Sequence, residues 1–111
     1  MKTYHIIVTP DANEDVLAIR NYFVNVRHDP RTAAIHVRAI REEIANLQTM
    51  PYKYKVVDDE PWHSRGVRLT LGGKYFVYYR VDEDATIVYI LNVVLASRDQ
   101  LKALAHMDLD W

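Results

Sequence analysis

The alternation of apolar and polar positions predicts a strand followed by a helix at the start of the chain. From Tyr4 to Thr9 the side chains alternate with the two-residue period of a β-strand. Asp11 and Glu14 then fit a capping box, in which a side-chain oxygen and a glutamate three residues on satisfy unpaired amides. Apolar residues follow at helical spacing, so the first helix is expected to end near Val26.

A second helix is predicted to begin at the Asp29-Pro30 pair. Asp29 suits the N-cap position and Pro30 suits the first turn, where the missing N–H of proline costs nothing. One face carries a narrow apolar stripe, made of Val37, Ile40, Ile44 and Leu47. Because the connection between the two helices is short, we expect an antiparallel hairpin whose apolar side covers a sheet.

Residues 48–64 have no clear period, and a loop of that length is more often functional than decorative. Three strands are predicted after it, over residues 67–71, 74–81 and 86–95. Gly72-Gly73 favours a two-residue turn with positive φ at both glycines between the first two strands. A short helix after Ser97 would bury Leu101 and Leu104.

The last two predicted strands differ in which faces are apolar. In the strand over 74–81, Tyr75, Val77, Tyr79 and Val81 oppose Lys74, Phe76, Tyr78 and Arg80. In the strand over 86–95, Ile87, Tyr89, Leu91, Val93 and Leu95 oppose Val88, Ile90 and Val94. Since both faces of this last strand are apolar, it is expected to be central in the sheet. The predicted class is α+β, in one domain over residues 1–111, with the order β-α-α-β-β-β and a short C-terminal helix.

Charge and composition narrow the classes of function. The formal net charge of −1 argues against a nucleic-acid binder held by overall basicity. Residues 61–81 nevertheless contain four basic side chains and no acidic one, while acids gather at 58–60 and 82–84. This distribution fits either one basic face or the ordinary alternation of a soluble surface. The chain has no cysteine, which excludes disulfides and thiol catalysis and fits a reducing compartment. A cytoplasmic protein without membrane segment, metal or cofactor is therefore expected.

Three stretches of the chain resemble the RelE/ParE superfamily of bacterial toxins, the plasmid-stabilisation proteins of type II toxin–antitoxin modules. They are YHIIVTPDANED, the I-x-x-x-I-x-x-L-x-x-x-P spacing that ends at Pro51, and RGVRLTLGGKYFVYYRVDEDATIVYILNVVLASRD. The resemblance implies a small, twisted, mostly antiparallel sheet packed against a helix hairpin. It also implies a growth-inhibiting toxin, neutralised by a cognate antitoxin whose apolar helix or strand lies along the sheet or the hairpin.

Members of this superfamily divide by target, and the residues bear on both branches. One branch cleaves mRNA on the ribosome without a metal, which needs a general base, cations for the phosphate and a general acid. Arg98 stands where that branch carries a catalytic arginine, and Arg68 could replace its basic pair. The full set of candidates for catalysis is Arg98, Arg68, Arg65 and His106. Those for RNA or phosphate binding are Arg80, Lys74, Lys53, Lys55 and His63.

Structural roles are the alternative for these side chains, such as an ion pair of Arg98 with Asp99. Phe76 also occupies a position where the RNA-cutting branch carries arginine, and Leu104 falls where that branch places a catalytic aromatic or histidine. Both departures favour the other branch, which poisons DNA gyrase and needs no catalytic residue. Ribosome-dependent mRNA cleavage is the first expectation, because four arginines are available. Gyrase poisoning and a non-toxic protein that keeps the fold are the alternatives.

Overall fold

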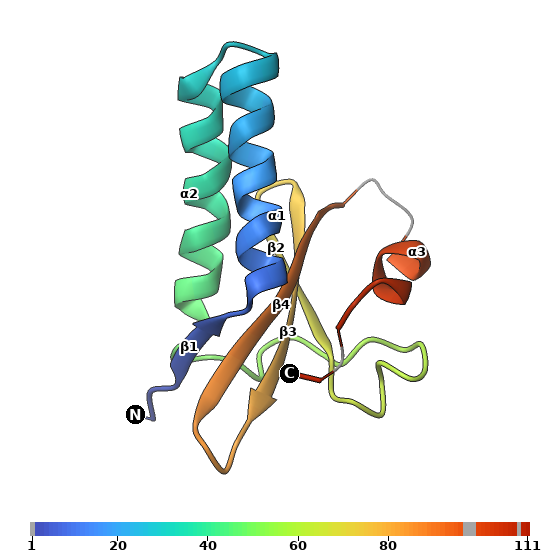
Figure 1. The fold of residues 1–111 in the computed structure, drawn as a ribbon. Helices are drawn as coiled ribbons and strands as arrows, with labels where there is room; N and C mark the ends of the chain where they lie inside the picture. Colours follow the sequence, from blue (N-terminus) through green and yellow to red (C-terminus); the bar gives the residue numbers. More distant parts are fainter. Residues whose placement is uncertain (1, 97–99, 109) are drawn as a thin grey trace.

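The computed structural model describes residues 2–96, 100–108 and 110–111. In this part of the chain four strands form one mixed sheet in the order β1-β4-β3-β2 (Figure 1). The strands are β1 (His5–Val8), β2 (Arg68–Gly72), β3 (Tyr75–Asp82) and β4 (Ile87–Leu95). β1 pairs with β4 in parallel and the other two pairings are antiparallel. The α+β class, the mostly antiparallel sheet and the central place of the last strand are therefore confirmed.

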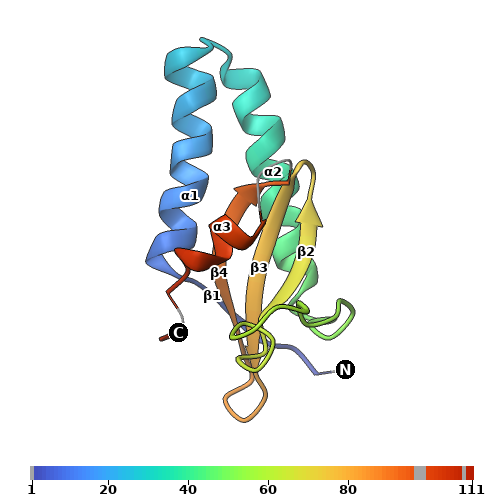
Figure 2. The same ribbon diagram turned by 90° about the vertical axis from the view of Figure 1, so that its right-hand side faces the viewer.

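Two helices form a hairpin on one face of this sheet (Figure 2). α1 (Pro10–Asn21) continues into a π-helical turn, η1 (Tyr22–Val26), and α2 (Pro30–Asn46) returns beside it. The Asp29 cap is confirmed, since its Oδ1 accepts a hydrogen bond from the Thr32 amide at 3.0 Å.

The capping box predicted at Asp11 and Glu14 is wrong. The N-cap of α1 is Thr9, whose Oγ1 accepts from the Ala12 amide. Pro10 explains the shift, because its fixed φ suits the first helical position and moves the cap to the preceding residue.

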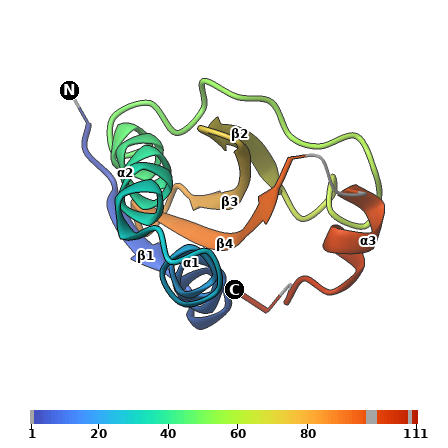
Figure 3. The same cartoon turned by 90° about the horizontal axis from the view of Figure 1, so that it is seen from above.

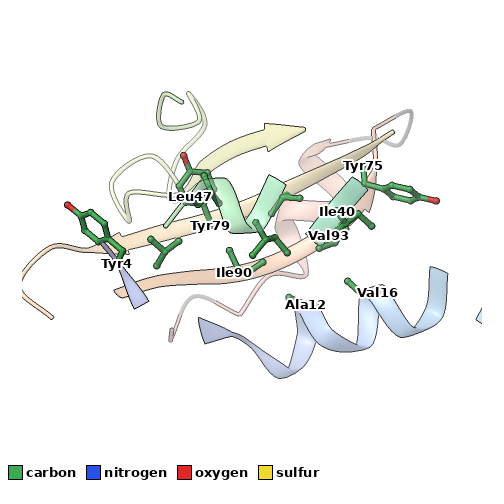
Figure 4. Close-up of a cluster of buried hydrophobic side chains, with 12 residues drawn as sticks. Tyr4, Ala12, Val16, Ile40, Leu47, Tyr75, Tyr79, Ile90 and Val93 are labelled. Atoms are coloured by element: carbon green, nitrogen blue, oxygen red, sulfur yellow. The ribbon is translucent and has the colours of Figure 1, made fainter. Parts of the chain in front are cut away.

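The main core lies between the hairpin and the sheet. Ala12 and Val16 point from α1 towards the strands, and Ile40 does so from α2 (Figure 4). The predicted stripe of α2 is confirmed, with Ile40, Ile44 and Leu47 buried and Val37 packed against them. Burying these side chains supplies most of the force that holds the hairpin on the sheet.

A second, smaller core lies on the opposite face of the sheet. The C-terminal helix α3 (Gln100–Ala105) covers that face (Figure 3). The buried members of this core are Val67, Tyr78, Leu91, Leu104 and Met107. The predicted burial of Leu104 is thus confirmed, whereas the side chain of Leu101 lies outside the described part of the chain. No helix in that part is long and apolar enough to cross a membrane.

A β-bulge in β4 corrects the predicted faces of that strand. Tyr78 pairs with Asn92 and Tyr79 with Ile90, which leaves Leu91 without a direct partner on β3. The extra residue shifts the two-residue period by one, so later side chains change face. Val93 and Leu95 consequently join Val88 and Ile90 under the helices, while Tyr89, Leu91 and Val94 belong to the second core.

The turn between β2 and β3 also differs from the expectation. Only Gly73 has a positive φ, of 63°, and Gly72 belongs to β2, where it pairs with Tyr75. Gly72 meets a different requirement, because a Cβ there would lie 2.9 Å from the Cα of Ile40. The close approach of α2 to β2 therefore depends on a residue without a side chain.

Candidate functional site: an arginine pocket and an apolar groove

One concavity brings together two of the predicted site residues. Its volume is about 480 Å³, and we call it the arginine pocket. It is lined by Ser64, Arg65, Val67, Arg80, Leu91, Asp110 and Trp111. Val67 and Leu91 are members of the second core, so the pocket lies on the face away from the helix hairpin.

Arg80 reaches this pocket from β3, directly opposite Tyr89 of β4. Its guanidinium lies 4.9 Å from the centroid of the Tyr89 ring. Its Nε donates a hydrogen bond of 2.6 Å to the main-chain oxygen of Trp111, whose ring lies 6.1 Å from that of Tyr89. Arg80 is thus already held by an aromatic ring and by the C-terminal residues. Arg65 is exposed, and within the described residues its side chain has no hydrogen-bond or ion-pair partner.

Arg68 lies on the other face of the sheet. It stands opposite Tyr79, a member of the main core, and neighbouring residues of a strand point to opposite faces. Its guanidinium donates to the carbonyl of Tyr54 at 2.6 Å and lies 4.9 Å from the centre of the Tyr52 ring. These contacts hold the segment after α2 against the edge of the sheet. The structure therefore separates Arg68 from Arg65 and Arg80.

The remaining candidates are dispersed over the surface. The Lys53 ammonium lies 5.5 Å from the Tyr54 ring, and Lys55 pairs with Asp58 at 3.4 Å, where both side chains are exposed. The Nδ1 of His63 is 2.8 Å from the carbonyl oxygen of Val57. His106 is exposed and neither histidine lines the arginine pocket. Arg98 lies outside the described residues.

Tyr79, the residue paired with Arg68, has the environment of a structural side chain. It is fully buried, and its hydroxyl donates to the carbonyl of Pro51 at 2.7 Å. Burial raises the pKa of Tyr79 to about 12, so the hydroxyl stays protonated at neutral pH. Among the described residues no cluster of three metal-ligating side chains is present.

A larger concavity lies between the helix hairpin and the ends of β3 and β4, and we call it the apolar groove. Its volume is about 720 Å³. It is lined by Asp15, Ala18, Ile19, Tyr22, Phe23, His36, Lys74, Tyr75, Val93, Val94 and Leu95. Most of these side chains are apolar, and the polar ones mark its borders. Lys74 is thus placed here and not at the arginine pocket.

An aromatic cluster forms one wall of the apolar groove. The Phe23 and His36 rings are 4.5 Å apart, and the Nδ1 of His36 lies 2.9 Å from the Tyr75 hydroxyl oxygen. Tyr22 remains 46% exposed beside them. An apolar surface bordered by polar groups is typical of a site for a partner's helix or strand. No pattern in the sequence predicted this groove, because its lining comes from the first two helices and from two strands more than 35 residues further along the chain.

The fold has counterparts among solved structures of toxin–antitoxin systems. The chain is similar to a chain of the chromosomal ParDE system from P. aeruginosa, at 23% identity and a TM-score of 0.69, over 86% of this chain and 98% of that one. It is also similar to a chain of the RelBE2 toxin–antitoxin complex from Mycobacterium tuberculosis, at 24% identity and a TM-score of 0.62, over 87% of this chain and 97% of that one. A chain of the archaeal RelE–RelB complex from Pyrococcus horikoshii is similar at 17% identity and a TM-score of 0.55, over 87% of this chain and 99% of that one.

Sequence comparison gives the family. No curated protein matches the chain. The family model described as "ParE toxin of type II toxin-antitoxin system, parDE" matches residues 6–100, which include α1, α2, β2, β3, β4 and all of β1 except His5. The match covers well over half of the chain, and the protein therefore belongs to the ParE toxin family of type II toxin–antitoxin systems.

Proposed function

We propose that this toxin stops growth by binding and poisoning DNA gyrase, and that it performs no reaction of its own. The observation that carries the proposal is the dispersal of the candidate arginines within the described part of the chain. Arg68 and Arg80 lie on opposite faces of the sheet, and each is already held by main-chain oxygen and an aromatic ring. A toxin that acts by binding needs a surface but no assembled group of catalytic side chains.

The chemical requirements of RNA cleavage also support this proposal. A 2′-hydroxyl must lose a proton and the leaving 5′-oxygen must gain one, so two proton-transfer groups have to flank the phosphate. Among the side chains that line the arginine pocket, Asp110 supplies one carboxylate, and besides the two arginines no other side chain there titrates. One group and two arginines fall short of that requirement among the described residues.

Ribosome-dependent mRNA cleavage is the second candidate. One observation favours it, namely that Arg65 and Arg80 line the same pocket and could share a phosphate. On this alternative Trp111 would have to leave Arg80 before RNA could bind. A non-toxic protein that keeps only antitoxin binding is the third reading.

Two assays on the purified protein separate these functions. Gyrase is incubated with negatively supercoiled plasmid and increasing toxin, and linear DNA is measured after protein denaturation. In parallel, mRNA 5′ ends are mapped in a bacterial translation extract. We expect toxin-dependent linear DNA and an unchanged mRNA pattern. New mRNA ends that need translating ribosomes, with gyrase unaffected, would overturn the proposal, and inactivity in both assays would favour the non-toxic reading.

The cognate antitoxin is the partner that the family implies, and we propose that an apolar segment of it occupies the apolar groove. The groove is lined by exposed Tyr22 and by the ends of two strands, and Asp15, His36 and Lys74 offer polar contacts at its border. An amphipathic segment could bury its apolar side there and keep its polar side in water.

Two exposed apolar residues of η1 provide a matched test of the groove. Tyr22 lines it, whereas Val26, one turn away and 63% exposed, does not. We expect Tyr22→Glu to weaken binding of the cognate antitoxin by about tenfold or more, because a carboxylate would be buried. Val26→Glu should bind as the wild type does. Equal affinities of the two variants in isothermal titration calorimetry would place the antitoxin elsewhere.

A further inference from the structure

The C-terminal residues enter the arginine pocket as a bound peptide would. Leu104 and Met107 are buried in the second core and fix the point at which the tail begins. Beyond them, Asp110 and Trp111 line the pocket itself. The Trp111 main-chain oxygen accepts from Arg80, and its indole ring lies beside that of Tyr89. We call Asp110 and Trp111 the tail.

These contacts define what the pocket recognises. Arg80 donates a hydrogen bond to a main-chain oxygen, and the Tyr89 ring lies beside an aromatic side chain. The Asp110 side chain lines the same concavity. A second guanidinium, that of Arg65, is exposed and without a partner in the described part of the chain. When the Trp111 oxygen and the Asp110 side chain leave the pocket, both guanidiniums can bind the carboxylates of another segment.

We propose that the arginine pocket is a binding site for an acidic peptide segment that carries an aromatic residue. In the free protein the chain's own tail occupies this site, and a partner's segment enters by displacing it. The partner's aromatic ring would replace Trp111 against Tyr89, and its carboxylates would meet Arg65 and Arg80. This site is separate from the apolar groove, with which it shares no lining residue.

The group that occupies the pocket is a peptide segment, so we infer a peptide ligand rather than a nucleotide. The tail binds through a main-chain oxygen and an indole ring, which any peptide of similar chemistry reproduces. A tail attached to the fold also has an effective concentration on the order of millimolar, which masks the site from a weak external ligand. The tail must therefore be disabled before binding in trans is measured.

The test uses a fluorescein-labelled peptide with the sequence of residues 107–111, MDLDW. Its binding is followed by fluorescence anisotropy with the wild type and with the Asp110→Asn, Trp111→Ala double variant. We expect the double variant to bind about tenfold or more tightly than the wild type, since its own tail no longer competes. Adding Arg80→Gln to that variant should remove the gain. Adding Arg38→Gln, an exposed arginine of α2 outside the pocket, should not.

A second measurement follows the tail in the otherwise intact protein. The indole N–H resonances of Trp62 and Trp111 are resolved by NMR and assigned with Trp111→Ala. We expect Arg80→Gln to move the Trp111 resonance to the position of an unstructured chain and to leave that of Trp62 in place. This readout requires no external ligand and reports directly whether Arg80 holds the tail.

Several outcomes would overturn the proposal. Equal binding of MDLDW to the wild type and the double variant, or no binding to either, would show that the tail does not occupy a peptide site. Displacement of the labelled peptide by adenosine monophosphate or by a single-stranded oligonucleotide, but not by unlabelled MDLDW, would show a phosphate site instead. An unchanged Trp111 resonance in Arg80→Gln would show that Arg80 does not hold the tail.

Discussion

Asp15 stabilises the bulge of β4 from the neighbouring helix. Its Oδ2 accepts from the Val93 amide at 2.8 Å and from the Asn92 side-chain amide at 3.3 Å. On the other side of the bulge, the Thr9 hydroxyl donates to the carbonyl of Ile90 at 2.7 Å. Partial burial raises the pKa of the Asp15 carboxyl above its ordinary value, although these hydrogen bonds act to lower it.

The raised pKa of Asp15 predicts a pH dependence of stability. The folded state holds this proton more tightly than the unfolded state, so the contribution of Asp15 is greatest below its unfolded pKa. It is lost as the pH rises through the raised folded-state pKa. Asp15→Asn keeps an acceptor oxygen but does not titrate. We expect the difference in unfolding free energy, wild type minus Asp15→Asn, to fall as the pH rises above the ordinary pKa of an aspartate.

Urea unfolding at a series of pH values measures this difference and cancels the titration of the other carboxyls. A flat difference would contradict the prediction. Asp15→Ala serves as a second variant, because it leaves the Val93 amide without its partner. It should cost about 1–3 kcal/mol at low pH, and this cost should fall with rising pH as it does for Asp15→Asn.

At the scale of elements, the approach of α2 to β2 depends on Gly72. The atoms nearest to a Cβ at this position are the Cα of Ile40 and the carbonyl oxygen of Ala39, both of the helix backbone. A backbone contact cannot be relieved by a change of rotamer, so the helix itself would have to move. Gly66 offers a contrast, since its φ is +74° but nothing lies within 4 Å of a Cβ there.

These two glycines give a paired prediction about packing and backbone conformation. Gly72→Ala should lower the unfolding free energy by about 1–3 kcal/mol through displacement of α2. Gly66→Ala should cost roughly 1 kcal/mol, the strain of a left-handed conformation alone. Chemical denaturation of both variants checks the order. A smaller loss for Gly72→Ala than for Gly66→Ala would show that the helix adjusts at little cost.

At the scale of the whole molecule, the sheet separates two surfaces that differ in chemistry. The helix hairpin and strand ends form the apolar groove, whereas β3, β4 and the tail form the arginine pocket on the other face. Sites without shared residues usually respond independently to substitution. The two proposals together imply that an apolar segment and an acidic one would bind at the same time.

This separation predicts that substitutions at the two surfaces do not affect each other. Tyr22→Glu should weaken antitoxin binding and leave binding of the MDLDW peptide to the tail-disabled protein unchanged. Trp111→Ala should leave antitoxin affinity within about 0.5 kcal/mol of the wild type. Calorimetry with each ligand alone and then with both would check this. Competition between the antitoxin and the peptide would mean that one partner covers both surfaces.

Local sequence determined the elements of this protein and their order. The features that predicted them are properties of short stretches of the chain. They are the apolar periods of two and of 3.6 residues, the Asp29-Pro30 start of α2, and the apolar character of both faces of β4. Each acts through neighbours along the chain, so the sequence alone sufficed to predict it. The resemblance to the toxin superfamily rested on the same elements taken in order.

The tertiary structure determined which face of the sheet each strand residue occupies and which candidate side chains lie together. The extra residue in β4 is stabilised by Thr9 and Asp15, which are far away in sequence, so no local pattern announces it. Arg68 and Arg80 look alike in sequence, but strand register sends them to opposite faces of the sheet. The occupation of the arginine pocket by Trp111 likewise depends on the path of the chain after α3. Contacts between residues distant in sequence arise only when the chain has packed, and they determine which candidate side chains share a site.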